Sequence, residues 1–381
     1  MTASNVITPT DVRELEACVQ EANARGIALQ VVGGESKRSV GRPGRVTTNV
    51  STARFAAIID YDPAELVLTV GPGAKLRDVE ALLEANGQML AFEPINWGDS
   101  TIGGVVAAGF AGSRRVSAGN VRDHVLGVSA VSGRGERFVA GGRVVKNVTG
   151  YDLPKLLCGS WGQLAIATEI TLKVLPRPRT SLTLWVRGLD AESASKTMLL
   201  ALRSQADVSG AAFIPAGADN ESQTLLRLEG FGPSVDARTE MLRESLPQSF
   251  ERVNEAADVW AKLRSAWLLE RDSNAAVWRI CIPATRCASM LTAIREWRGS
   301  GIADWGGGLI WANLATSIAG SNVRACVEQL GGHATLVAAP DEYRNEVPAL
   351  HPETAAVSRL SERVRAAFDP ARVLDPRRFH A

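Results

Sequence analysis

The chain has 381 residues, long enough for two domains that each bury a hydrophobic core. Its 45% hydrophobic and 22% charged residues are typical of a soluble globular protein, and its net charge of +1 gives no broad field to attract nucleic acid or an anionic membrane surface. No apolar run reaches the roughly eighteen residues of a spanning helix, and the start, MTASNVITPTDVRELE, lacks a secretory signal. We therefore expect a protein that stays in the cytoplasm, where it can also be docked to a partner.

The first 180 residues alternate between strand and helix patterns. Thr10 or Asp11 can cap a helix whose apolar residues follow helical spacing to Gly26, and a buried strand over 27–32 then runs into two glycines. A second helix begins near Leu76. Repeated strand–helix–strand units predict an α/β or α+β fold rather than a helical bundle. Further strands are predicted over 46–50, 55–59, 66–70, 125–131, 137–139 and 168–174.

A different pattern begins after Pro176-Arg177-Pro178, which is typical of a boundary. Strands and helices now follow nearly as βαββα written twice, which predicts two ferredoxin-like units that share one sheet. The predicted strands are 182–187, 209–214, 223–229, 276–282, 301–305, 308–313 and 334–338, and the predicted helices are 191–206, 234–246, 254–269, 284–297, 319–330 and 354–368. Six tryptophans lie here, which we expect to pack in cores and interfaces rather than on a ligand: Trp260, Trp267, Trp278, Trp297, Trp305 and Trp311.

The cysteines limit the redox chemistry that the chain can carry by itself. They are scattered and contain no CxxC pair, which argues against both a disulfide framework and an iron–sulfur cluster. We expect most to be small core residues, and any iron–sulfur cluster to lie in another chain. The five are Cys18, Cys158, Cys281, Cys287 and Cys326.

The loop Gly33–Lys37, with the sequence GGESK, is the first candidate for ligand binding. A strand that ends in two glycines lets successive backbone N–H groups point into one concavity, which suits a pyrophosphate. The loop has neither the GxGxxG of a Rossmann fold nor the GxxxxGK[ST] of a P-loop. Because double glycines also occur in plain turns, this motif is a weak signal when taken alone.

Residues 98–115, GDSTIGGVVAAGFAGSRR, are the second candidate. Small residues at so many successive positions permit close approach to a ring system. Ser100 and Thr101 offer hydroxyls to phosphate oxygens, and Arg114 or Arg115 can supply positive charge near an anion. The segment is too apolar for a flexible linker, so we expect it to pack against something flat or phosphorylated.

Two later segments complete the pattern, GGRVVKNVTGYDL over 141–153 and CGSWGQLAIATEITLKV over 158–174. With the first two candidates, in this order, they resemble the FAD-binding domain of the vanillyl-alcohol oxidase and p-cresol methylhydroxylase superfamily. The resemblance covers residues 1–180 and, more faintly, the ending FDPARVLDP over 368–376. Within the superfamily, the segment SRRVSAGNVRDHVLGVSAVSGRGE and the block from GGRVVK to VLPRP look like the FAD-binding subunit of bacterial glycolate oxidase.

The resemblance implies an α+β fold in three parts. A two-subdomain p-cresol methylhydroxylase-type FAD-binding domain would span residues 1–180, and a ferredoxin-like α+β cap domain would span 181–345. Residues 346–381 would form a C-terminal helix and tail that return to the FAD domain.

The resemblance also implies binding residues. Gly33–Lys37 would be the pyrophosphate loop and Ser100–Gly104 would complete the phosphate cradle, while 107–115 would pass near the flavin and 159–166 would contact the adenine–ribose side. Asp123, Lys146 and Tyr151 match family positions, with structural pairing as an equal alternative to cofactor contact. The implied FAD-binding residues are Gly33, Gly34, Glu35, Ser36, Lys37, Asp99, Ser100, Thr101, Gly103, Gly104, Ala107, Gly109, Arg114, Arg115, Gly159, Gly162 and Ile166.

Two departures from the superfamily concern histidines. None lies between residues 27 and 45, where members that attach FAD covalently often carry one, so we expect non-covalent FAD. The HxGDGNxH-like segment of the catalytic 2-hydroxyacid dehydrogenases is also absent; the chain has only His124, His333, His351 and His380. We interpret His333 as a surface or core histidine rather than a general base, and we predict neither a catalytic base nor a metal site.

Three functions remain open. The leading hypothesis is the FAD-binding subunit of a glycolate oxidase complex, which oxidises glycolate to glyoxylate beside a related catalytic flavoprotein subunit and an iron–sulfur subunit. The alternative is an autonomous FAD-dependent oxidase of a 2-hydroxy acid or polyol, with Arg or Tyr residues of the second half binding the substrate. A third is an assembly scaffold that keeps the fold without flavin, which the intact phosphate loop disfavours.

Overall fold

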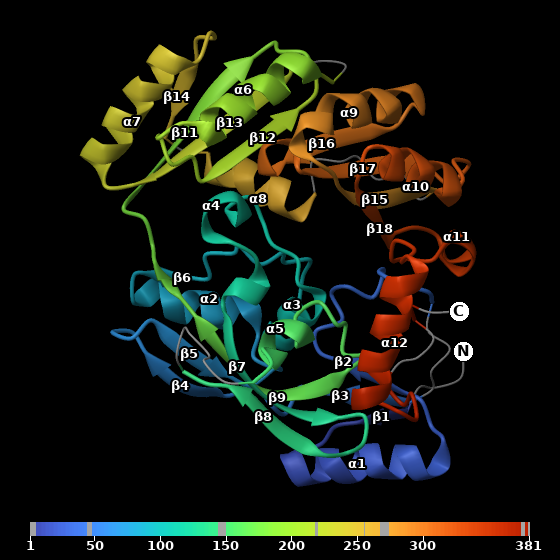
Figure 1. Cartoon of the computed structure of the whole chain (residues 1–381). Coiled ribbons are helices and arrows are strands. Elements are labelled where there is room, and N and C mark those ends of the chain that lie inside the picture. The colour runs from blue at the N-terminus through green and yellow to red at the C-terminus, as the bar shows by residue number, and fades with distance from the viewer. Residues whose placement is uncertain are drawn as a thin grey trace.

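The protein is described here from a computed structural model that covers residues 5–43, 48–143, 150–217, 220–254, 256–266, 274–374 and 378–379. Lys146, Trp267, His380 and the start of the strand predicted over 46–50 lie outside these ranges. Two sheet-bearing units are stacked in Figure 1: a lower unit (residues 5–176) and an upper unit (residues 180–338). Within the ranges given, no helix is both long enough and apolar enough to cross a membrane.

A three-stranded parallel sheet, in the order β1-β3-β2, opens the lower unit. Helix α1 (Val12–Arg25) packs against it through Leu15 and Val19. Asp11 caps this helix by accepting a hydrogen bond from the Glu14 N–H at 3.0 Å, and Gly26 ends it with a φ of 64°. The predicted start and end are therefore confirmed. The strands are β1 (Asn5–Ile7), β2 (Leu29–Val32) and β3 (Thr48–Ser51).

A five-stranded antiparallel sheet, in the order β4-β5-β9-β7-β8, forms the other half of the lower unit. Helix α2 buries Leu76, Val79 and Leu83 against it. The strands of this sheet are β4 (Ile58–Asp62), β5 (Val67–Val70), β7 (Val125–Ser132), β8 (Arg137–Gly141) and β9 (Ala165–Lys173). The other elements are α2 (Leu76–Ala85), α5 (Leu153–Leu157), the 3-10 turn η1 (Val121–Asp123) and the short pair β6 (Gln88–Met89) and β10 (Leu175–Pro176).

The glycine-rich segment contains helices that the sequence did not predict, namely α3 (Ile102–Ala108) and α4 (Arg115–Ala118). Thr101 caps α3 by accepting a hydrogen bond from the Gly104 N–H at 3.3 Å, and Gly109 ends it in the left-handed region with a φ of 66°. Two adjacent glycines weaken the helical signal of the sequence. The structure requires one of them for packing, because a Cβ on Gly103 would lie 2.7 Å from Cβ of Pro72.

The upper unit is one eight-stranded sheet in the order β14-β11-β13-β12-β16-β17-β15-β18, and all its pairings are antiparallel. The prediction of two βαββα units that share a sheet is confirmed, and the α+β fold class with it. Its strands are β11 (Thr180–Arg187), β12 (Gly210–Ile214), β13 (Gln223–Gly230), β14 (Glu251–Val253), β15 (Ala275–Cys281), β16 (Ser300–Asp304), β17 (Leu309–Ala315) and β18 (His333–Ala338). Its helices are α6 (Ala191–Arg203), α7 (Gly232–Ser245), α8 (Ala257–Ser265), η2 (Ala284–Arg286), α9 (Cys287–Glu296), η3 (Trp305–Gly307) and α10 (Gly320–Gln329).

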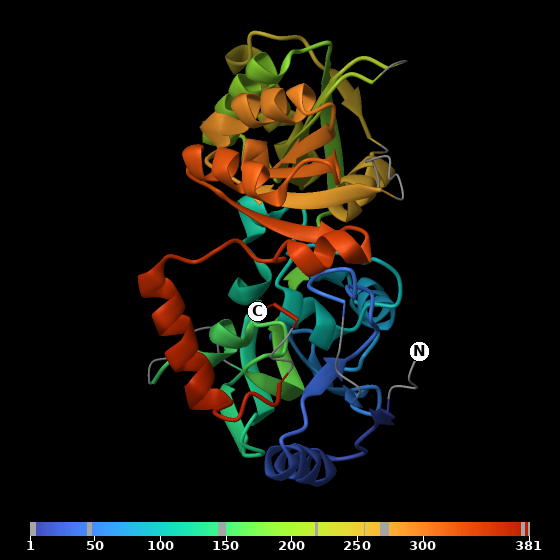
Figure 2. The ribbon, with the colours of Figure 1, turned by 90° about the vertical axis from the view of Figure 1, so that its right-hand side faces the viewer.

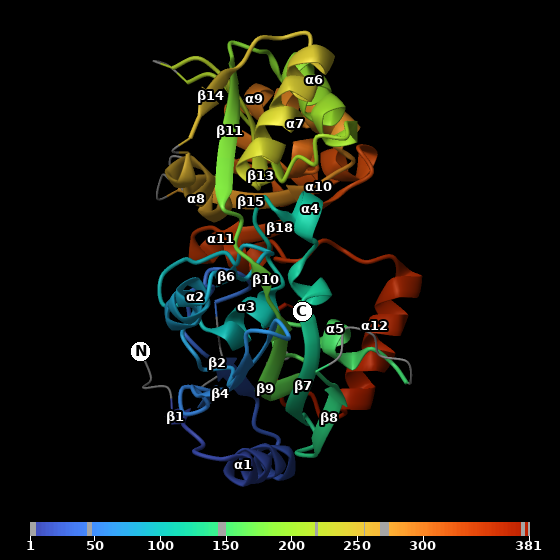
Figure 3. The same ribbon diagram turned by 90° about the vertical axis from the view of Figure 1, so that its left-hand side faces the viewer.

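The two faces of this sheet have different neighbours. Helices α6, α7, α9 and α10 cover one face and share a single apolar core with it. The other face packs on α8 and on the lower unit, where Trp311 shares a core with Ile95 and Phe110. Figure 3 shows α4 of the lower unit at this junction. Trp278 and Trp311 are fully buried, which confirms core packing for these two tryptophans.

After the upper unit the chain returns to the lower one. Helix α11 (Asp341–Glu346) is followed by α12 (Ala355–Phe368), which stands beside the lower unit in Figure 2. The Asp369 carboxylate then accepts hydrogen bonds from the N–H groups of Val373 and Leu374, and Leu374 bridges to Leu29 of β2. The C-terminal residues thus add to the parallel sheet.

Candidate functional site

The loop Gly33–Lys37 follows β2, and its backbone N–H groups are not used in hydrogen bonds within the described structure. None of its N–H groups donates a hydrogen bond to an acceptor in the described parts of the chain. Glu35 has a φ of 53°, in the left-handed region. A left-handed residue among consecutive free N–H groups is the backbone form of an anion-binding nest.

The loop packs directly on the segment that precedes α3, so the two predicted halves of the phosphate cradle meet. Oγ of Ser36 lies 2.9 Å from Oγ of Ser100. A Cβ on Gly34 would lie 1.5 Å from the carbonyl oxygen of Asp99, a distance that no side chain tolerates. Glycine is therefore required at position 34 by close contact between two backbones.

Lys37 places a buried cation beside this cradle. The residue is only 7% exposed, and Nζ donates to the carbonyl oxygen of Ile95 at 3.3 Å and to Oγ of Ser36 at 3.4 Å. No carboxylate within the described ranges pairs with it. Burial lowers the pKa of Lys37 to about 8. A buried ammonium group without a counter-ion favours an anionic ligand at this place.

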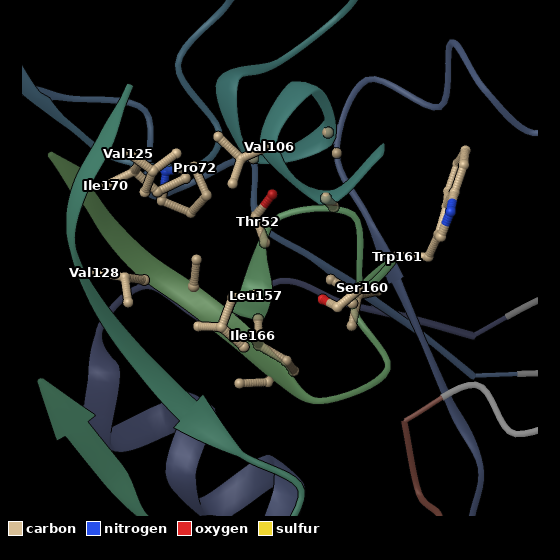
Figure 4. Close-up of a pocket in the computed structure, with 18 of the residues that line it drawn as sticks. Thr52, Pro72, Val106, Val125, Val128, Leu157, Ser160, Trp161, Ile166 and Ile170 are labelled. Carbon is tan, nitrogen blue, oxygen red and sulfur yellow. The ribbon is translucent and has the colours of Figure 1, made fainter. Parts of the chain in front are cut away.

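An apolar cavity lies between the two sheets of the lower unit (Figure 4). Strands β7 and β9 supply aliphatic side chains such as Val128 and Ile170, while Thr52 and Ser160 add hydroxyl groups and the Trp161 ring points away from the other labelled residues. Such a mostly apolar cavity with a few polar groups is typical of a site for a flat ring system. The predicted site residues that line it are Gly33, Gly103, Gly104, Ala107, Gly162 and Ile166.

The loop over 159–162 closes one side of this cavity by pairing with the end of α3. The Gly159 N–H donates to the carbonyl oxygen of Val106 at 3.0 Å, and the Trp161 N–H donates to that of Ala107 at 2.9 Å. Trp161 itself is left-handed, with a φ of 56°. These bonds fix the loop to the helix whose glycines face the cavity.

The side chains of other predicted residues are not part of the cradle. Glu35 pairs with Arg38 at 3.3 Å, and Asp99 pairs with Lys75 at 2.7 Å. Asp123 accepts a hydrogen bond from the Asn120 N–H, and the Tyr151 side chain is 90% exposed. Gly109 and Arg115 line a second, open cleft between the units, together with His333.

Arg114 belongs to a buried ion-pair network that joins the two units. Its guanidinium contacts Glu93 at 2.9 Å and Glu229 of β13 at 2.6 Å, and Arg227 of the same strand pairs with Glu93 at 2.9 Å. Burial raises the pKa of Glu93, but Arg227 and Arg114 outweigh it and hold this pKa at about 2. With these partners Arg114 positions the upper unit and is not free to pair with a phosphate.

The residues present fit a dinucleotide cofactor with a pyrophosphate. The nest and Lys37 supply donors and positive charge, and the adjoining cavity supplies an apolar surface with small residues at the helix that faces it. Among the described residues, no group of three or more His, Cys, Asp or Glu side chains could hold a metal ion.

Comparison with known proteins identifies the family. A family model described as an FAD-binding domain matches residues 3–141. Over 365 residues the chain is 36% identical to the glycolate oxidase subunit GlcE of Escherichia coli (strain K12), a match that covers 95% of each chain. The chain belongs to the GlcE family. The FAD-binding subunit of glycolate oxidase, predicted by resemblance, is thus confirmed as its family, with FAD as its cofactor.

More distant relatives agree with the GlcE assignment. Glycolate oxidase subunit GlcD of Bacillus subtilis (strain 168) is 34% identical over 175 residues, 46% of this chain and 36% of GlcD. The D-lactate dehydrogenase of Archaeoglobus fulgidus is 31% identical over 176 residues, 46% of this chain and 39% of that enzyme. These oxidoreductases place the GlcE-like chain among the FAD-dependent oxidoreductases.

A solved structure gives the same fold. An alkyldihydroxyacetonephosphate synthase has a TM-score of 0.71 at 15% identity, over 98% of this chain and 75% of that one. At this identity the likeness shows the fold alone. It agrees with the α+β fold class that the sequence predicted.

Proposed function

We propose that this chain is the FAD-binding subunit of a glycolate oxidase complex that oxidises glycolate to glyoxylate. The observation that carries the proposal is the 36% identity to GlcE over 95% of both chains. A match over nearly the full length includes the upper unit, whereas the match to GlcD covers only 46% of this chain. The relationship therefore involves more than a shared FAD-binding domain.

The cradle and the apolar cavity would hold the FAD. The N–H groups of Gly33–Lys37 and the Lys37 ammonium would pair with the pyrophosphate, and the glycines of α3 would let a ring lie close to the helix. When bound, FAD supplies two-electron oxidation chemistry to the complex. The protein's part is to orient the cofactor, and we place the FAD-binding domain over residues 1–180 with the cap over 181–345.

We expect the FAD to be non-covalent because no histidine or cysteine lies between residues 27 and 45. Acid precipitation of the purified chain tests this directly, since non-covalent flavin goes into the supernatant. Precipitated protein that stays yellow would contradict the proposal.

The chain would act beside partners, a related catalytic flavoprotein subunit and an iron–sulfur subunit. Its cysteines are free and dispersed in the structure, so they offer no cluster-binding set among the described residues. The complex would work in the cytoplasm, with any attachment to the inner face of the cell membrane made through the partners.

Glycolate-dependent reduction of a dye by the chain alone, compared with the co-expressed complex, tests this dependence. We expect turnover from the complex and little from the chain alone. Brisk turnover by the isolated chain would instead favour the second candidate, an autonomous oxidase of a 2-hydroxy acid or polyol. The open cleft between the units, with Arg115, Arg279 and His333 in its lining, is the observation that favours this candidate.

A further inference from the structure

The cleft between the two units has a volume of about 710 Å³. The lower unit contributes the end of α3 and the start of α4, and the upper unit contributes the end of β15, the turn at Trp305 and the start of β18. We propose that this cleft binds a small carboxylate, a 2-hydroxy acid or its 2-oxo acid, whose carboxylate pairs with Arg279 and Arg115. The identity of the acid rests on the proposed function, whereas the anion site rests on the contacts that follow.

Arg279 is a buried cation that lacks an anionic partner among the described residues. Arg279 lies on β15, between β17 and the edge strand β18, and is 9% exposed. Its side chain makes no ion pair or hydrogen bond to an oxygen atom in the described part of the chain. Nε has no hydrogen-bond acceptor among these residues. The guanidinium instead lies against the rings of Phe110 and Trp305, 5.0 and 5.1 Å from their centroids, and beside the Cys281 thiol. Burying a charge without an ion partner is costly, so its retention in a cleft indicates a ligand.

Arg115 brings a second cation to the same place. Its guanidinium carbon lies 4.1 Å from the centroid of the Trp305 ring, and no ion pair holds it among the described residues. The described residues that line the cleft include no Asp or Glu. Burial and the charge of Arg115 both lower the pKa of Arg279, because two neighbouring cations repel each other. An anion would relieve this repulsion, and a carboxylate matches the planar donors of a guanidinium.

Trp305 holds both guanidinium groups in place before any ligand arrives. Its Nε1 donates to the carbonyl oxygen of Gly112 at 2.9 Å, and its N–H donates to the Asp304 carboxylate at 2.7 Å. The other oxygen of that carboxylate accepts the Ser113 hydroxyl at 2.7 Å. Because the bonds to Gly112 and Ser113 cross from one unit to the other, the cation platform is rigid and the binding of an anion needs little reordering.

His333 distinguishes a substituted carboxylate from a simple anion. It lies at the exposed rim of the cleft, and partial burial together with Arg279 and Arg115 lowers its pKa, so its ring is neutral at pH 7. A neutral imidazole can donate to or accept from a hydroxyl or carbonyl next to the carboxylate. Apolar neighbours such as Phe110 and Pro283 favour a short acid. A phosphate ion carries no carbon substituent for these groups to recognise.

Isothermal titration calorimetry of the full-length chain with its bound FAD tests the proposal. Glycolate, acetate and inorganic phosphate are the ligands, electron acceptors are left out, and flavin absorbance reports the FAD content of each sample. We expect glycolate to bind more tightly than acetate or phosphate. R279Q and R115Q should each weaken glycolate binding about tenfold or more. R25Q, on the exposed face of α1, should bind as the wild type does.

The thermal stability of an Arg279 variant shows whether this side chain binds the ligand or only stabilises the fold. R279M removes a buried unpaired charge, so we expect its thermal midpoint to equal or exceed that of the wild type while glycolate binding is lost. A lower midpoint in R279M, glycolate binding that survives both glutamine variants, or FAD-loaded protein that does not bind glycolate would overturn the proposal. Phosphate bound as tightly as glycolate would indicate an adventitious ion only, and would overturn it as well. Protein without FAD would contradict the proposed function instead.

Discussion

The substitution Gly104→Ala tests whether Gly104 is needed for FAD binding rather than for the stability of the fold. Among the described residues, a Cβ on Gly104 would meet only Oγ1 of Thr101 within 4 Å, at 3.4 Å, which is ordinary van der Waals contact. Alanine favours a helix over glycine by roughly 0.5–1 kcal/mol, so α3 should not be destabilised. The same methyl group would face the cavity that Gly104 lines. We therefore expect FAD affinity to fall by about tenfold, or roughly 1.4 kcal/mol, while the FAD-free protein stays equally stable or becomes more stable.

The assay combines thermal unfolding of FAD-free protein with an FAD titration followed by flavin fluorescence. Gly142→Ala is the matched control, because a Cβ there has nothing within 4 Å and the residue does not line the cavity. Gly103→Ala should behave differently and lose stability, since its Cβ would lie 2.7 Å from Cβ of Pro72. Wild-type FAD affinity in Gly104→Ala would refute the placement of the cofactor in this cavity.

Two further predictions concern charges. FAD affinity should decline as the pH rises through about 8, where Lys37 loses its proton. Lys37→Met should bind FAD more weakly and without that decline, whereas the exposed control Lys196→Met should keep it. The same pH profile in both variants would contradict the role of Lys37. Glu93→Gln should lower the free energy of unfolding, measured with urea, by about 3–5 kcal/mol, because two buried arginines then lose their carboxylate partner. The exposed control Glu84→Gln should lower it by less than about 1 kcal/mol. The pKa of Glu93 is about 2 in the folded protein and 4.5 ordinarily, so its contribution to the free energy of unfolding is present above pH 4.5 and is lost as the pH falls toward 2. An equal loss of stability in Glu93→Gln and Glu84→Gln would argue against a buried network.

The sequence predicted most of the fold because a helix or strand with one buried face shows a regular spacing of apolar residues. The helix predicted over 319–330 is observed as α10 over Gly320–Gln329, and the strand over 276–282 as β15 over Ala275–Cys281. The short strand β14 and helix α11 were not predicted, because three to six mostly exposed residues leave no period to detect. Helix α3 was missed for another reason, since its glycines serve packing and the cavity rather than helix formation.

The sequence predicted the candidate site less completely, because it depends on contacts between distant residues. The motifs identified the loop and the segment that would pair, and the structure joins them through Gly34 and Asp99. Nothing local in the sequence shows that Arg114 pairs with Glu229, 115 residues away. Nor does it show that Arg279 has no such partner in the described parts of the chain. The strand residues that line the cavity, such as Val128, have the pattern of ordinary core positions. Only tertiary structure distinguishes a buried charge that is paired from one that is not.

The flavin content of the chain purified alone tests the central claim most directly. A chain that holds FAD through its own cradle should show flavin absorbance as isolated, in an amount equimolar with protein, and should release that flavin on acid precipitation. A colourless chain that also fails to take up added FAD would contradict the claim, because its glycine loop and cavity would then serve only the packing of the fold.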